Sequence, residues 1–274
     1  MMSEAILVLD ADGRVGLACV QSLGALGHRM HTGVRRLGSA TERSTWCHRV
    51  HAQPPAEPVQ AGVEWLTELD RRFGFTLVFA TTEASLRWLR AMPEDHPVRI
   101  KAVLPSDESL DAALDKARTS VIARELGLPV PSAWELPQTG PTTQAGSTGA
   151  HGETSHEPDV PGRAYPRVLK PVRSKVVIGQ RLVSLSVAIV HDAAERASTL
   201  ESLRPFTPVQ EQAWVPGRGI GVEVLYDRGR MAWNFVHERL HEWPLTGGAS
   251  TLRRAGGPEP ELVEMTRRLL ARLQ

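Results

Sequence analysis

The stretch YPRVLKPVRSKVVIG, residues 165–179, is the part of the sequence around which the rest is organised. Its first half has the pattern of a short buried strand that ends in Lys170, and its second half is a basic turn closed by Gly179. Because a strand holds its side chains stiffly, Lys170 presents a positive charge at a fixed position. The turn, which carries Ser174 and Lys175, can fold over an anion. We expect a nucleoside triphosphate to be that anion.

Composition narrows the class of protein. The 274 residues suggest one large domain or two to three small ones, with 41% hydrophobic and 23% charged residues, as in ordinary globular proteins. A net charge of +1 favours neither a nucleic acid nor an acidic membrane surface as partner. Cys19 and Cys47 have no metal or redox spacing, so we interpret them as structural thiols in a reducing, cytoplasmic compartment.

The N-terminal part begins with an apolar strand at 5–9, a helix and a second strand. The turn after the first strand carries Gly13 and Gly16, but it lacks the first glycine and the acidic residue of a dinucleotide fingerprint. We therefore favour a tight turn with close helix packing over nucleotide binding. Arg35 and Arg36 leave NADP binding open as an alternative.

An open α/β sheet is predicted to continue to residue 104. Ligands of such sheets bind beyond the carboxyl ends of the strands, which indicates the segments DADG at 10–13 and TTEAS at 81–85. The elements predicted here are a helix at 59–73, a strand at 75–80, a helix that starts in 81–83, with a threonine available as N-cap, and runs through 89, and a strand at 98–104.

The second part begins with helices that end at Gly127, and Lys116 lies in one of them. Residues 137–164 are rich in Gly, Pro, Thr, Ser and His, which predicts a disordered insertion. Further elements are predicted as strands at 132–136, 181–190 and 208–215, a helix at 192–203, a hairpin with its turn at 227–230, a loop at 246–250 and a helix at 259–274.

Three segments in this order carry a resemblance to a known family: LDKARTSVIARELGLPVP at 114–131, YPRVLKP at 165–171, and the run from VQEQAWVPG to TGGAST at 209–251. The chain resembles the ATP-grasp superfamily of carboxylate–amine ligases, which includes D-alanine–D-alanine ligase, biotin carboxylase and the carbamoyl-phosphate synthetase large subunit. The resemblance implies an α/β fold in three parts. These are a Rossmann-like pre-ATP-grasp domain at 1–104, a small α+β subdomain at 105–215, and an incomplete second subdomain at 216–274.

The resemblance also implies roles for individual residues. Lys116 and Lys170 would contact the α- and β-phosphates of ATP, and Arg173–Gly179, with Ser174, Lys175 and Gly179, would close over the triphosphate. Arg239 would be catalytic, because the paired N–H donors of its planar guanidinium suit an oxyanion. The alternative is that Arg239 forms an ion pair with Glu238 or Glu242. The hinge that binds the adenine ring, largely through its backbone groups, would consist of Glu211, Gln212 and Trp214.

The implied reaction joins a small-molecule carboxylate to a small-molecule amine through an acyl phosphate, with ATP and Mg²⁺. Carboxylate ligands for Mg²⁺ are expected beyond Gln274, since Glu259, Glu261 and Glu264 have the pattern of solvated helix charges. The sequence thus predicts an ATP-binding fragment of a ligase, inactive by itself because the carboxylates for Mg²⁺ are absent from it. The alternatives are a non-catalytic nucleotide-binding protein of the same fold and an NAD(P)-dependent oxidoreductase. The oligomeric state stays open, with a homodimer as one option.

Overall fold

The structure is a computed structural model that describes residues 3–136, 163–172, 175–178, 181–243 and 249–273. Contacts divide the chain into two compact units, Met1–Pro105 with Val177–Leu182, and Ser106–Val176 with Val183–Gln274. We describe each unit by itself. The predicted insertion at 137–164 lies outside the described residues except for its last two positions.

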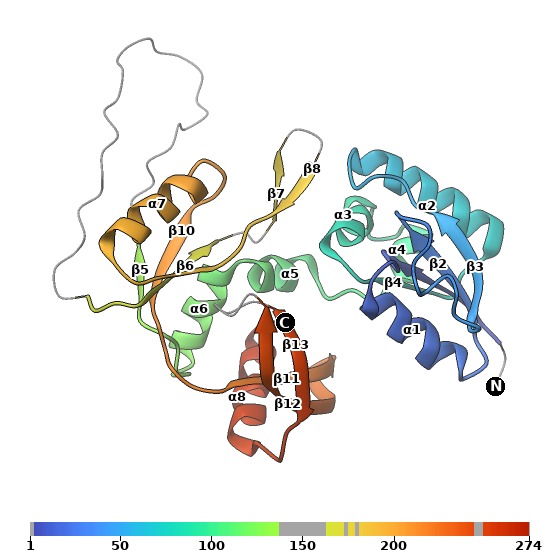
Figure 1. Cartoon of the computed structure of the whole chain (residues 1–274). Coiled ribbons are helices and arrows are strands. Elements are labelled where there is room, and N and C mark those ends of the chain that lie inside the picture. Colours follow the sequence, from blue (N-terminus) through green and yellow to red (C-terminus); the bar gives the residue numbers. More distant parts are fainter. Residues whose placement is uncertain (1–2, 137–162, 173–174, 179–180, 244–248, 274) are drawn as a thin grey trace, which may run out of the picture. The chain divides into compact units, whose positions relative to one another are not determined.

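The first unit contains a parallel sheet in the order β3-β2-β1-β4. All five residues of β1 are buried, which explains its uninterrupted apolar sequence. Helix α1 covers one face of the sheet, and α2 and α3 cover the other (Figure 1). The predicted α/β fold is confirmed. The elements are β1 (Ala5–Leu9), α1 (Arg14–Gly24), β2 (Arg29–Val34), β3 (Cys47–Ala52), α2 (Val59–Phe73), β4 (Leu77–Ala80) and α3 (Glu83–Ala91).

Gly16 brings α1 close to the turn that follows β1. A Cβ atom at this position would lie 2.4 Å from the Cα of Ala11, a distance that real side chains do not reach. A Cβ at Gly13 would meet nothing within 4 Å, and Gly13 has an ordinary extended conformation. The packing interpretation of this turn therefore accounts for Gly16, which lies in the first turns of the helix.

The predicted strand at 98–104 is wrong. Pro97 opens a short helix, α4 (Pro97–Ile100), and the His96 side chain accepts a hydrogen bond from the Val98 backbone N–H at its start. Proline has no N–H to lose at a first helical position, so this position suits it. Only an isolated bridge between Val78 and Ala102 follows. Strand β3, in contrast, was not predicted.

The second unit begins with α5 (Asp107–Leu114) and α6 (Lys116–Glu125), followed by an antiparallel sheet in the order β5-β10-β6-β9. Gly127 follows α6 with a φ of +67°, as predicted for a glycine that ends a helix. Helix α7 packs on one face of the sheet over a core that includes Leu169 and Leu200. The elements of this layer are β5 (Ala133–Glu135), β6 (Arg167–Pro171), β9 (Ala188–Val190), α7 (Ala193–Leu203) and β10 (Val209–Ala213).

The continuous strand predicted at 181–190 is also wrong. The chain forms β8 (Arg181–Ser184), which pairs with β7 (Lys175–Ile178), and then β9, which pairs with β6. The change of pairing partner breaks the strand at 185–187. The predicted loop at 173–179 contains β7, while Ser174 and Gly179 lie outside the described residues.

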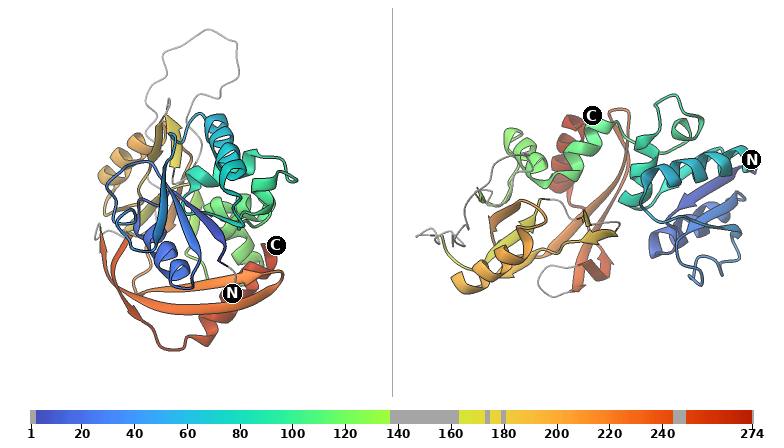
Figure 2. Two further views of the ribbon diagram at one scale, coloured as in Figure 1. Left: turned by 90° about the vertical axis from the view of Figure 1, so that its right-hand side faces the viewer. Right: turned by 90° about the horizontal axis from the view of Figure 1, so that it is seen from above.

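A third, antiparallel sheet consists of β11 (Gly219–Asp227), β12 (Arg230–Trp243) and β13 (Ala249–Ala255), and α8 (Pro260–Arg272) packs against it (Figure 2). The predicted hairpin is confirmed, because Arg228 and Gly229 form its turn with positive φ angles. In the predicted loop at 246–250, residues 246–248 lie outside the described part, and the last two residues begin β13 instead.

Candidate functional site

The register of β6 and β10 places three polar side chains on one face of their sheet. Lys170 is paired with Gln210, and Val168 with Gln212, so these residues share a face by the alternation of side chains in strands. The Nε2 of Gln212 donates a hydrogen bond to the Oε1 of Gln210 over 2.8 Å. Helix α7 packs on the other face of the same sheet. The face that carries Lys170 is therefore the one with polar groups for a ligand.

Lys116 reaches the end of the same strand from α6. The carboxylate of Asp115 caps α6 by accepting hydrogen bonds from the backbone N–H groups of Ala117 and Arg118, which fixes the start of the helix. Lys116 is the first helical residue, and its Nζ donates to the carbonyl oxygen of Pro171 over 3.3 Å. Pro171 follows Lys170 directly, so the two predicted phosphate contacts come from segments that meet.

The surroundings of Lys170 suit a phosphate. Burial lowers the pKa of this half-buried lysine from its ordinary value, and no charged group is among the causes. Within the described part of the chain, no carboxylate forms an ion pair with it. A lysine held half-buried without a carboxylate gains when a phosphate supplies the counter-charge.

Glu211 points away from this face. Its side chain is fully buried, with Oε1 3.0 Å from Nη1 of Arg167 and Oε2 3.0 Å from Nη2 of Arg196. The carboxylate therefore joins β6, β10 and α7. The prediction that Glu211 contacts adenine concerns its backbone groups, and it stays a prediction. Trp214 follows β10 and is 43% exposed.

Arg239 lies on β12 with its Nη1 3.4 Å from Oε1 of Glu242. Of the two ion pairs considered from the sequence, this is the one that forms, since Glu238 contacts Arg218 and Arg254. The side chain of Arg239 remains 40% exposed, so the ion pair leaves it accessible. The catalytic role of Arg239 stays a prediction.

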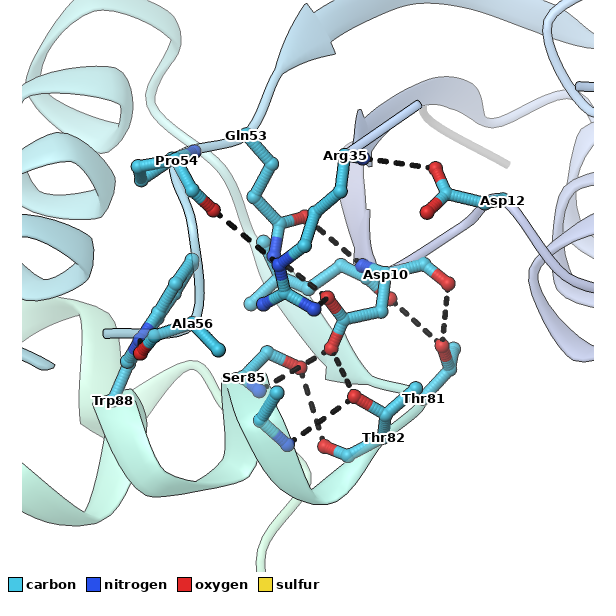
Figure 3. A network of polar contacts seen from close by, with 12 residues as sticks. Asp10, Asp12, Arg35, Gln53, Pro54, Ala56, Thr81, Thr82, Ser85 and Trp88 are labelled. Atoms are coloured by element: carbon cyan, nitrogen blue, oxygen red, sulfur yellow. Dashed lines mark hydrogen bonds and ion pairs between the residues drawn. The ribbon is translucent and has the colours of Figure 1, made fainter. Parts of the chain in front are cut away.

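A second polar cluster lies at the carboxyl edge of the N-terminal sheet (Figure 3). Asp10 is buried with a φ of +54°, and Arg35 Nη1 lies 2.5 Å from its Oδ1. The Nε2 of Gln53 donates to the same oxygen over 2.8 Å. The backbone N–H of Ser85 and the hydroxyl of Thr82 donate to Oδ2. The cluster thus links the ends of β1, β2 and β3 to the start of α3.

This cluster bears on the alternative that the N-terminal unit binds NADP through Arg35 and Arg36. The two segments singled out, 10–13 and 81–85, do meet here, whereas Gln53 was missed because β3 was not predicted. The guanidinium of Arg35 also donates to the carbonyl oxygen of Pro54 over 3.3 Å and lies over the Trp88 ring. Arg35 is therefore engaged within the protein, which weakens the case for an NADP 2′-phosphate at this position.

The residues that the structure describes do not fit Mg²⁺. They contain no group of three or more His, Cys, Asp or Glu side chains that could hold a metal ion. Glu264 pairs with Arg267 on the surface of α8 at 2.6 Å, which is the solvated helix charge that its sequence predicts. Lys175 begins β7, and its side chain lies outside the described part of the chain.

Comparison by sequence finds no family model that matches and no match among curated proteins. Comparison with solved structures gives many matches, and these show the fold: the chain has an ATP-grasp fold, like the ligases and the carboxylase among these structures. The resemblance seen in the sequence is thereby confirmed at the level of the fold. No helix in the described part is both long and apolar enough for a membrane span.

Three of these structures illustrate the likeness. L-amino acid ligase from Bacillus licheniformis is 13% identical with a TM-score of 0.66 over 100% of this chain and 61% of its own. Biotin carboxylase from Campylobacter jejuni is 12% identical with a TM-score of 0.65, over 99% and 60%. An N5-carboxyaminoimidazole synthase from Aspergillus clavatus, complexed with ADP and 5-aminoimidazole ribonucleotide, is 15% identical with a TM-score of 0.60, over 98% and 62%. The chain thus spans about three-fifths of the length of these proteins.

Proposed function

We propose that the chain is the ATP-binding part of an ATP-dependent carboxylate–amine ligase. The observation that carries this proposal is the approach of Lys116 to the end of the strand that carries Lys170, on a sheet with the ATP-grasp fold. Two lysines from different elements would supply positive charge to the phosphates of the nucleotide. The solved ADP and ATP complexes of similar structures support the choice of nucleotide.

The chemistry asks mainly for positioning and charge neutralisation. A carboxylate oxygen of the first substrate attacks the terminal phosphorus of ATP, and ADP leaves, which gives an acyl phosphate. The nitrogen of an unprotonated amine then attacks the acyl carbon, and phosphate leaves with the proton that the amine loses as the amide forms. Lys116 and Lys170 hold the phosphates of ATP during the first step. Exclusion of water protects the acyl phosphate in the second.

The further parts of the proposal rest on the resemblance in sequence and not on the described contacts. Arg239 would stabilise the acyl intermediate, and Gln212 and Trp214 would contact the adenine together with backbone groups of Glu211. Ser174, Lys175 and Gly179 would close over the triphosphate. Mg²⁺ would need carboxylates that the described residues do not bring together. The substrates would be small molecules, and the protein would act in the cytoplasm.

Calorimetric titration with ATP, ADP and NADP tests the nucleotide. We expect saturable binding of ATP and ADP and none of NADP. Binding of NADP with no binding of ATP would overturn the proposal in favour of an oxidoreductase.

The acyl phosphate has its own test. Hydroxylamine traps acyl phosphates as hydroxamates. This chain alone should yield none, because its described residues do not bring together carboxylates for Mg²⁺. A longer protein that carries this chain and supplies those carboxylates should yield a hydroxamate from ATP, hydroxylamine and one class of amino acid or other small carboxylate. If such a protein binds ATP and no carboxylate yields a hydroxamate or ADP, the function is that of a non-catalytic nucleotide-binding protein of this fold.

A further inference from the structure

A pair of histidines lies between β2 and β3 of the N-terminal unit. The Nδ1 of His31 and the Nε2 of His51 share a hydrogen bond of 2.9 Å, and the two rings stack with their centroids 5.2 Å apart. Both rings also contact Phe73, at the end of α2, with centroid distances of 5.0 Å. A hydrogen bond between two imidazoles needs one nitrogen without a proton, so at least one ring of the pair is neutral.

Arginines surround the same phenylalanine. The Cζ atoms of Arg49 and Arg72 lie 5.0 and 5.3 Å from the centroid of the Phe73 ring, and both side chains belong to exposed residues. Within the described residues neither guanidinium forms an ion pair with a carboxylate. Their neighbour Arg71 does form one, with its Nη2 2.7 Å from Oε1 of Glu68. After Arg71, Arg72 also lowers the pKa of Glu68, so this carboxylate lies near Arg72, and Arg49 is the guanidinium of the cluster with no such neighbour among the described groups. Phe73 is thus the common neighbour of two guanidinium groups and two imidazole rings.

The surroundings of the pair disfavour a proton on either ring. Burial first, and then the surrounding positive groups, lower the pKa of both His31 and His51 to about 4. The groups that act on the two rings are Arg29 from β2, His48 and Arg49 from β3, and Arg72 from α2. All of them are basic.

A metal ion does not suit this cluster. The positive groups that disfavour a proton on the histidines also disfavour a cation, and the described residues offer no third ligand in metal geometry. An anion suits it well, because guanidinium groups bind oxyanions through paired N–H donors and a protonated imidazole adds another donor. A dianion would match several positive charges at once.

We propose that Arg49, Arg72 and His51 form a binding site for the phosphate group of a small molecule at the β3 edge of the N-terminal sheet. The site is independent of the proposed ligase function, since it uses none of the residues assigned to ATP. Binding draws a proton onto the histidine pair, because an anion beside His51 offsets the positive groups around it. Affinity for a dianion therefore rises as the pH falls.

Calorimetry with inorganic phosphate and with sulfate, at constant ionic strength, tests this site. Sulfate keeps its charge across the range from about pH 7.5 to about pH 5.5, so any change in its affinity reports protons taken up by the protein. We expect saturable binding of both anions, and tighter sulfate binding at the lower pH. In Arg49→Gln and Arg72→Gln we expect affinity to fall about tenfold or more, as for loss of a charge-assisted contact.

Two controls separate this site from general attraction and from the ATP site. Arg14→Gln removes an exposed charge at the start of α1 that is not among the groups acting on the two histidines, and Lys170→Ala removes a proposed ATP contact; both should bind sulfate as the unchanged protein does. The proposal is overturned if the unchanged protein shows no saturable binding, or if Arg14→Gln weakens binding as much as Arg72→Gln does. Loss of sulfate binding in Lys170→Ala would assign the anion to the ATP site instead.

Discussion

The Nζ of Lys116 donates a hydrogen bond to the carbonyl oxygen of Pro171, and this contact joins the start of α6 to the end of β6. From the sequence, a lone lysine in a helix is ordinarily a solvated side chain. The structure places it beside the residue that follows Lys170 instead. The contact turns two separate sequence features into one candidate phosphate site.

If both lysines hold the same phosphates, their substitutions should not be additive. We expect Lys116→Met and Lys170→Met each to weaken ATP binding, and the double variant to weaken it by less than the sum of the two free-energy changes. Calorimetric titration of ATP into the unchanged protein, the two single variants and the double variant gives the four free energies of this double-mutant cycle. Strict additivity would mean that the lysines act at unconnected places.

Gly16→Ala should destabilise the N-terminal unit by about 2 kcal/mol or more, because the new methyl group would collide with the backbone of Ala11. The gain in helix propensity, about 1 kcal/mol, opposes this loss and does not cancel it. Gly13→Ala is the matched control, since nothing lies near its Cβ position. Urea unfolding measures both. Equal midpoints for the two variants would contradict the close packing of α1 on this turn.

Glu211→Gln should cost about 3 kcal/mol or more, because it leaves the buried guanidinium groups of Arg167 and Arg196 without their carboxylate. Glu201→Gln, an exposed change on α7, should leave the unfolding free energy within about 0.5 kcal/mol. Urea unfolding compares the two. A Glu211→Gln variant as stable as the control would mean that the buried ion pairs do not support the sheet.

The histidine pair predicts a pH dependence of the N-terminal unit. The pKa values of His31 and His51 are lowered from 6.5 to about 4, so the unfolded chain binds more protons between these values. This contribution to stability is fully present above pH 6.5 and is lost as the pH falls toward 4.

Hydrogen exchange of the buried β1 amides, corrected for intrinsic rates, follows this unit alone. His51→Gln removes one titrating ring, so its stability should change less with pH than that of the unchanged protein. The same pH slope in both proteins would contradict the linkage.

Strongly patterned elements could be predicted from the sequence. The strand β1 is a run of five buried apolar residues, and α2 matches its predicted range, with Gly74 as a left-handed cap. Strands β3 and β13 were missed because they are edge strands with polar, partly exposed side chains, so their sequences lack the apolar pattern. Pairing with a neighbour, which a local pattern does not contain, makes them strands.

The candidate site was predictable in type but not in orientation. Lys170, at the end of its strand, and Lys116, the first residue of α6, were identified as phosphate contacts from the resemblance to ATP-grasp ligases. The direction of Glu211 could not be predicted, because Val209, Gln210, Glu211 and Gln212 are all buried, and burial alone does not distinguish the two faces of β10. Only the pairing with β6 decides it.

The central claim is that Lys170 belongs to an ATP site, and titration of the Lys170→Ala variant with ATP tests it most directly. Loss of a charge-assisted contact to phosphate should weaken binding by about 1.5–3 kcal/mol, or roughly 10- to 100-fold, while Arg71→Gln binds ATP as the unchanged protein does. An ATP affinity that is the same in Lys170→Ala and in the unchanged protein would contradict the account.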